Sequence, residues 1–351
     1  MSKKSTYLEV LGSLSYSQTQ KEIIAANAAA EAMKNSKRSH RSQYTFAKVA
    51  SVAACLLCLL TVTAEAAGIH TPVSRWLAPI FGNRTAQTEV IDSIGVPLDA
   101  SDTDNGITIK AEAIIGDAYN TAVLFSITRD DGQPILPEEV TVNQLMLGGW
   151  GSISTQEGGS HGTSRFLDSD PGDNTIQYLM VRSYEMPMTK EPVVVQFSDL
   201  KYQDVEAEEI KVLYEGNWRF RFEMDYEDSS VILGSGETFQ DNGMEFTIKE
   251  VRVSPIAIRI SYEVDSEAQW SNAPSGRLPE EDRRQHERYM ENVSIQLMKT
   301  DGTVIDMTNS GGSIQPGNGI TYCTKGDVLP EIIPMEELDR IIVGDIEYTI
   351  P

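Results

Sequence analysis

The chain has 351 residues, and its 29 Lys and Arg against 52 Asp and Glu give a formal net charge of −23. So acidic a chain is poorly suited to neutralise phosphates, and no nucleic-acid binding is expected. Its 40% hydrophobic content is enough for a folded core, while three cysteines and four histidines argue against a disulfide scaffold and a structural zinc site.

The charge is divided unevenly along the chain. Residues 1–48 contain eight basic and three acidic side chains, whereas residues 49–67 contain Glu65 alone. Residues 68–351 contain 21 basic and 48 acidic side chains. A small basic arm and a large acidic body therefore lie on either side of an apolar stretch.

Residues 1–45, the basic arm, are predicted to be helical. Apolar side chains from Tyr7 to Leu14 fall at helical spacing, Ser17 and Gln20 fit a capping box, and residues 23–33 are rich in alanine. The arm is expected either to dock through its apolar stripe on a cytoplasmic partner or only to set the topology of the chain in a membrane.

Residues 46–69 are predicted to form one transmembrane helix in contact with membrane lipid. Residues 49–64 carry no charge, and the whole apolar zone is long enough for a bilayer core, which takes about 20 residues. Lys and Arg at positions 34–41 precede it and should stay in the cytoplasm. We therefore expect a single-pass protein of the cell membrane, with its N-terminus cytoplasmic and its C-terminal part extracellular.

Two alternatives to a retained anchor stay open. Residues 64–66, Ala-Glu-Ala, could be a signal-peptidase site with cleavage after Ala66, although the preceding arm is longer than a usual n-region. A soluble buried helix would leave the one-sided basic cluster unexplained. Cys55 and Cys58 lie within this apolar stretch, where helical spacing does not favour a redox or zinc motif.

Residues 70–100 form a juxtamembrane segment whose first part is aromatic and apolar. Trp76 and Phe81 favour a membrane–water interface, and Pro72 and Pro79 limit any continuous helix. We expect this part either to lie along the outer leaflet or to pack beneath the first β module. A flexible spacer is the alternative.

Residues 101–228 are predicted to form a first β module, because apolar and polar residues alternate. Ile107–Ile114 and Asn120–Thr128 alternate before an Asp-Asp-Gly turn, and Val193–Phe197 is equally typical of a strand. In Trp218–Met224 the large rings lie on one face, opposite Arg219 and Arg221.

Residues 229–351 are predicted to form a second, related β module. Gly243–Val253 resembles residues 105–114, with Thr-Ile-Lys in both, and each segment is followed by another strand. Residues 292–305 are typical of a hairpin turning at Asp301-Gly302, and Glu280–Arg288 of one exposed helix. The predicted fold is mainly β: two tandem antiparallel β-sandwich-like modules outside the membrane, after one transmembrane helix and a short helical arm.

Recognisable catalytic chemistry is absent from the sequence. His70, His161 and His286 stand in no nucleophile-elbow or H-E-x-x-H context. Two acidic loops, residues 99–106 and 168–174, depart from the EF-hand pattern and are predicted to be solvated turns rather than calcium sites. We therefore predict a non-enzymatic protein and assign no catalytic, cofactor-binding or metal-binding residue.

The order of these segments resembles Gram-positive membrane-anchored proteins that carry domain of unknown function 4179. The likeness lies in His70–Gly82, Gly106–Lys110 and Asn120–Thr128, while the strand at 216–222 and the second module resemble domain of unknown function 5643. Several such proteins resemble anti-sigma factors. The resemblance thus implies a cytoplasmic sigma factor as the partner of residues 1–45, although the arm lacks the His-x-x-x-Cys-x-x-Cys zinc motif of the commonest anti-sigma domain.

Two functions follow as hypotheses. The first is an envelope-sensing or anti-sigma-like regulator, in which the extracytoplasmic domains sense a condition and the arm binds a sigma factor. The alternative is a tethered extracellular adhesion or scaffold module with no cytoplasmic signalling role.

Overall fold

A computed structural model describes residues 72–351 except 150–158, 189, 191, 272 and 274–278. The predicted arm and the apolar segment at 46–69 lie outside the described residues. Within the described part of the chain, no helix is both long and apolar enough to cross a membrane.

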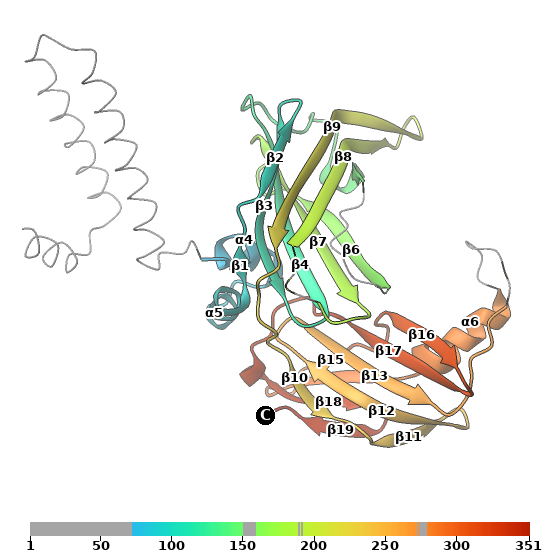
Figure 1. Cartoon of the computed structure of the whole chain (residues 1–351). Helices are drawn as coiled ribbons and strands as arrows, with labels where there is room; N and C mark the ends of the chain where they lie inside the picture. The colour runs from blue at the N-terminus through green and yellow to red at the C-terminus, as the bar shows by residue number, and fades with distance from the viewer. Residues whose placement is uncertain (1–71, 150–158, 189, 191, 272, 274–278) are drawn as a thin grey trace, which may run out of the picture. The chain divides into compact units, whose positions relative to one another are not determined.

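The described chain is mainly β, and its paired strands are antiparallel (Figure 1). The N-terminal strands form a sheet of order β1-β3-β4-β7-β6, with β2 also paired to β3, and a second sheet of order β5-β8-β9. We call these two sheets the first sheet pair. Its strands are β1 Val96–Pro97, β2 Ser101–Asp104, β3 Ile107–Gly116, β4 Asn120–Arg129, β5 Leu145–Gly148, β6 Ser160–Leu167, β7 Thr175–Tyr184, β8 Pro192–Asp204 and β9 Glu209–Glu223, with the short helix η1 Val142–Gln144 before β5.

One apolar core fills the space between the sheets of the first pair. Trp218 on β9 is fully buried there, and its indole Nε1 donates a 2.8 Å hydrogen bond to the carbonyl oxygen of Ile107. Phe220 and Phe222 are also buried, whereas Arg219 and Arg221 are exposed. The predicted two-faced strand at 218–224 is therefore confirmed.

The C-terminal strands form the second sheet pair, with sheets of order β10-β12-β13-β17-β16, β11 also pairing with β12, and β15-β14-β18-β19. The predicted hairpin at Asp301-Gly302 is confirmed as the turn between β14 and β15, and the predicted helix begins at Glu280. The elements are β10 Val231–Gly234, β11 Thr238–Asp241, β12 Met244–Val253, β13 Ala257–Val264, α6 Glu280–His286, η2 Glu287–Glu291, β14 Ile295–Lys299, β15 Val304–Asp306, β16 Gly312–Gly317, β17 Ile320–Val328, η3 Met335–Glu337, β18 Leu338–Val343 and β19 Ile346–Thr349.

The two sheet pairs repeat one topology, because β1 to β4 are arranged as β10 to β13 are, and β6-β7 as β16-β17. Asn-Gly turns with positive φ, at 105–106 and 242–243, precede β3 and β12. One-residue bulges then follow at Glu112 and Lys249. When the two copies are aligned on these turns and bulges, Thr108 is equivalent to Glu245 and not to Thr247. The predicted alignment through Thr-Ile-Lys is therefore wrong. The shared feature is the geometry of the turn and bulge, which does not require shared strand residues.

The segment before the strands forms two short helices, α4 Ser74–Phe81 and α5 Thr85–Ile94, which we call the helical hairpin (Figure 1). Pro79 lies inside α4, and this helix ends two residues later. Gly82 joins the helices with φ +121°, and a Cβ there would collide with the side chain of Gln87. The expected packing against the first β strands is confirmed, and the flexible-spacer alternative is wrong.

The acidic stretch at 99–106 contains a strand, β2, where a solvated turn was expected. The carboxylates of Asp102 and Asp104 accept hydrogen bonds from the backbone N–H groups of Arg219 and Asn217, at 2.8 and 2.9 Å. These aspartates therefore cover the exposed edge of β9, a protection that edge strands commonly need.

Candidate functional site

The strongest candidate site is the junction where the helical hairpin and the two sheet pairs meet. Two equivalent turns of the repeat lie in contact there: the β3–β4 turn at Asp117 and the β12–β13 turn at Ser254. Each side chain caps its own turn, since Asp117 Oδ1 accepts from the backbone N–H groups of Tyr119 and Asn120, and Ser254 Oγ from that of Ala257. Ser254 Oγ then donates to Asp117 Oδ2 at 2.6 Å, which joins the two turns.

The Asp117 carboxylate is withdrawn from solvent. Its residue is only 2% exposed, and Ser254 is 0% exposed. Burial raises the pKa of Asp117, while hydrogen bonds from Ser254, Tyr119 and Asn120 act in the opposite direction. A buried carboxyl group needs all of these donors, because leaving polar atoms unpaired in a low-dielectric interior costs about 1–3 kcal/mol.

Arg259 on β13 reaches across the junction to the first sheet pair. Its guanidinium donates to the carbonyl oxygens of Tyr184 at 3.3 Å and Glu185 at 3.0 Å. It also lies 4.0 Å from the centroid of the Tyr119 ring, a cation–π distance. Burial lowers the pKa of Arg259, but an arginine keeps its charge in proteins. Its hydrogen bonds to Tyr184 and Glu185 therefore do not depend on pH.

The helical hairpin closes the junction with an apolar face. Leu77 and Ile91 are both 0% exposed and belong to a cluster that contains residues of β3, β4 and β7 on the face away from the first core. The same cluster includes Ile256 and Ile332 of the second sheet pair. The helical hairpin and both sheet pairs therefore contribute side chains to one small core.

Polar contacts also bind the hairpin to residues 331–337 of the second sheet pair. Gln87, which is buried, donates from Nε2 to the carbonyl oxygen of Ile332 at 2.9 Å and to Glu331 Oε2 at 3.1 Å. Arg84 makes a two-pronged ion pair with Glu337, at 2.7 and 2.9 Å. A bidentate pair of this kind fixes orientation as well as distance.

The hairpin is also held internally. Asp92 on α5 accepts from the backbone N–H and the hydroxyl of Ser74 at the start of α4, at 2.7 and 2.8 Å. This satisfies an N-terminal donor of α4 from the neighbouring helix, since the N-cap side chain of α4 makes no such bond. The two helices are therefore bonded to each other as well as to the sheets.

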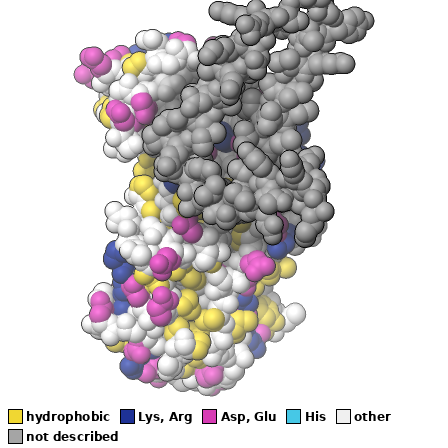
Figure 2. Space-filling view, turned by 90° about the vertical axis from the view of Figure 1, so that its left-hand side faces the viewer, with side chains coloured by type: hydrophobic (Ala, Val, Ile, Leu, Met, Phe, Trp, Pro, Cys, Tyr) yellow, Lys and Arg dark blue, Asp and Glu magenta, His cyan; other side chains and the backbone are white. Residues whose placement is uncertain are grey.

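The histidines and the cysteine of the described residues are not brought together at one site. His161 lies exposed on β6, His286 lies half-buried on α6, and His70 lies outside the described residues. Cys323 is buried in the second core, where burial raises the pKa of its thiol to about 12. In the described ranges, no group of three or more His, Cys, Asp or Glu side chains is placed to hold a metal ion. Figure 2 shows acidic side chains scattered over the visible face rather than gathered at one point.

The pattern of residues along the chain does not predict the junction. One signal was available: β3 and β4 lose their alternation at residues 113–116 and 120–125, where every residue is buried. A strand buried on both faces requires a cover on its outer face. Neither Asp117 nor Ser254 differs in sequence from an ordinary turn residue, so their contact could not be inferred.

No protein-family model matches the chain, and no curated protein matches it. Among solved structures, the crystal structure of the conserved domain protein from Bacillus anthracis is 13% identical, with a TM-score of 0.45, over 76% of this chain and 82% of that one. This likeness bears on neither family nor function.

Proposed function

We propose that the protein is a single-pass membrane protein that acts as a non-enzymatic envelope-sensing or anti-sigma-like regulator, as the resemblance to proteins with domains 4179 and 5643 implies. Residues 46–69 cross the membrane, and residues 1–45 bind a sigma factor in the cytoplasm. Residues 101–228 and 229–351 are two β-sandwich-like modules outside the cell.

One observation carries this proposal: the helical hairpin follows the apolar segment directly and is bound to both sheet pairs at once. A passive tether needs no such attachment, because a spacer of any sequence would hold an adhesion module at the surface. Because both sheet pairs contact the hairpin, a shift of one sheet pair relative to the other would change the contacts of the hairpin. This gives the extracytoplasmic part a route to the membrane segment.

The topology is tested with fusions to a reporter that is active only outside the membrane. A fusion after residue 100 should be active, and one before residue 40 inactive. Activity of the early fusion would overturn the orientation. Immunoblotting of the native protein tests the anchor, since cleavage after Ala66 would release a shorter chain to the medium.

Signalling is tested by the Arg84→Ala and Gln87→Ala variants of the full chain in its own cell. Sigma-dependent transcription should change, and the full chain should co-purify with a sigma factor through residues 1–45. Arg340→Ala is the matched control, because the ion pair of Arg340 with Glu347 joins β18 to β19 and does not involve the hairpin. Unchanged transcription in all three variants, with no sigma factor bound, would favour the adhesion or scaffold function.

A further inference from the structure

The edge of β9 is covered over one half of the strand and uncovered over the other. The aspartates of β2 bond to its backbone at residues 217 and 219, and Asn105 Nδ2 donates to the carbonyl oxygen of Glu215 at 3.2 Å. Among the described residues, no side chain bonds to the backbone of residues 210–214, and β9 pairs only with β8. Figure 1 shows this end of the β8–β9 hairpin projecting beyond the other strands of the first sheet pair. We call residues 210–214 the open edge.

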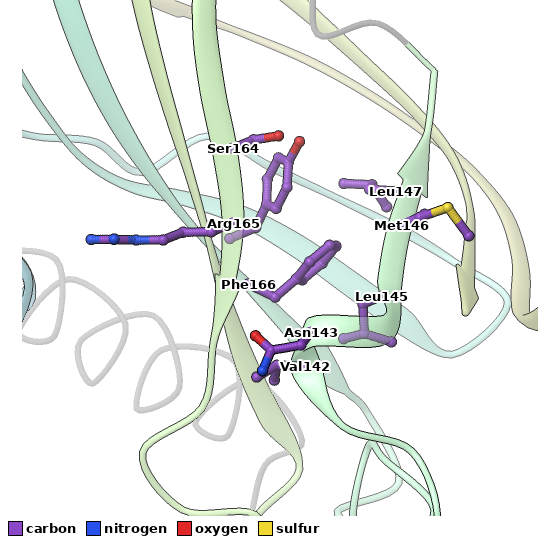
Figure 3. Close-up of a pocket in the computed structure, with 9 residues that line it drawn as sticks. Val142, Asn143, Leu145, Met146, Leu147, Ser164, Arg165 and Phe166 are labelled. Carbon is purple, nitrogen blue, oxygen red and sulfur yellow. The ribbon is translucent and has the colours of Figure 1, made fainter. Parts of the chain in front are cut away.

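Other edge strands carry the protection that sheet edges usually have. β1 is two residues long and contains Pro97, β15 is three residues long, and β16 contains Pro316. β5, at the opposite edge of the same sheet, borders a cavity of about 330 Å³ and leads into residues outside the described part (Figure 3). The open edge contains no proline, and residues 192–271 around it are described without a gap.

Exposed apolar side chains lie on the open edge. Ile210 and Val212 are 59% and 48% exposed, and Val205, in the turn before β9, is 69% exposed. Because side chains alternate along a strand, Ile210 and Val212 lie on the same face of the hairpin. Aliphatic side chains exposed beside an unpaired backbone are typical of a strand that accepts a further strand.

The charges around the open edge are mainly negative. Glu206, Glu208 and Glu215 are exposed and form no ion pair within the described part of the chain. Lys211 lies among them, but it is already paired with Asp204 at 2.7 Å. A second copy of this chain, with its net charge of −23, would be repelled, whereas a segment rich in lysine or arginine would be attracted.

We propose that the open edge binds an extended basic segment of a partner protein, which adds to β9 as a further strand. Main-chain hydrogen bonds to residues 210–214 hold the segment, and its alternate apolar side chains cover Ile210 and Val212. Its basic side chains neutralise the three unpaired glutamates. The charge of these glutamates thus selects a basic partner and disfavours pairing between copies of the chain.

Binding of three short fluorescent peptides to the full chain in a nonionic detergent tests the proposal. Valine alternates with lysine in the first peptide, valine with glutamate in the second, and serine with lysine in the third. Fluorescence anisotropy measures each dissociation constant. Amide hydrogen exchange, with and without the first peptide, locates the binding site, because an added strand protects the amides to which it bonds.

The valine–lysine peptide should bind more tightly than either of the others and should slow amide exchange within residues 209–215. Val212→Lys should weaken its binding about tenfold, the effect expected when one aliphatic side chain is no longer buried. Val304→Lys is the matched control, because Val304 is 49% exposed on the edge strand β15 and gains the same charge. It should leave binding unchanged, with thermal melting confirming that both variants are folded.

Four results would overturn the proposal. The valine–glutamate or serine–lysine peptide could bind as tightly as the valine–lysine peptide. The valine–lysine peptide could bind without slowing exchange in residues 209–215, as a peptide attracted only by the overall charge would. Val304→Lys could weaken binding as much as Val212→Lys does. Finally, sedimentation could show a dimer that Val212→Lys dissociates, which would make the open edge a contact between two copies of this chain.

Discussion

Asp117 and Ser254 occupy equivalent positions of the repeat and carry different side chains, so one can donate and the other accept. Two copies of either residue would not pair as well, since two carboxylates repel and two hydroxyls carry no charge. The divergence at this one position therefore stabilises the contact between the two turns.

A double-mutant cycle measures that contact. Asp117→Ala and Ser254→Ala should each destabilise the protein in urea unfolding, and the double variant should lose about 1–2 kcal/mol less than the sum, because both single changes break one charge-assisted bond. Ser313 and Thr324, whose hydroxyls lie 3.0 Å apart within the second sheet pair, form a neutral control pair. A coupling as small as theirs would show that the Asp117–Ser254 bond adds no specific energy.

Lys325 makes stability depend on pH. Burial lowers its pKa from 10.5 to about 8, partly offset by Glu291 and Asp306. Between these two values the unfolded chain binds more protons than the folded one, so stability should rise with pH. Wild type should gain about 2 kcal/mol over Lys325→Met between pH 7 and pH 10, measured by urea unfolding at each pH. A constant difference between the two proteins would contradict this prediction.

At the scale of elements, the helical hairpin depends on the backbone at Gly82. An alanine there would need φ near +121° and would push on Gln87, so Gly82→Ala should cost roughly 1–3 kcal/mol. Amide hydrogen exchange should then quicken within residues 74–94. Gly132→Ala also has positive φ but open space around its Cβ, and it should leave the hairpin protected. Equal exchange in both variants would contradict a specific role for Gly82.

The elements that sequence could predict are those with a clear alternation of side chains. Trp218 to Phe222 and β12 alternate over most of their length, because one face meets a core and the other meets water. Strand β2, with its two aspartates, has no apolar face, so alternation predicts neither its pairing with β3 nor its bonds to β9. The packing of the helical hairpin on the first strands could be predicted from its apolar side chains. Its contact with the second sheet pair could not, since the bond of Gln87 to Ile332 joins distant parts of the chain.

At the scale of the molecule, the small core at the junction should unfold while the cores of both sheet pairs stay folded. Ile332→Ala removes apolar contacts from this core alone, and we expect a loss of about 2–4 kcal/mol with selective protease cleavage between residues 72 and 95. Leu297→Ala is the control, because Leu297 is buried in the second main core and its loss should weaken that core instead. Cleavage of the hairpin at the same rate in both variants would show that it does not depend on the junction.

The bond between Gln87 and Ile332 joins residues 245 positions apart. A chain made from its N-terminus presents Gln87 long before the segment that it binds, and loops this long are slow to close. The first strands can pair as they emerge, whereas the polar contacts of the hairpin must wait for residues 331–337. Docking of the hairpin is therefore complete only once residues 331–337 have been made, and a chain stalled before them would lack the bonds of Gln87 to Ile332 and of Arg84 to Glu337.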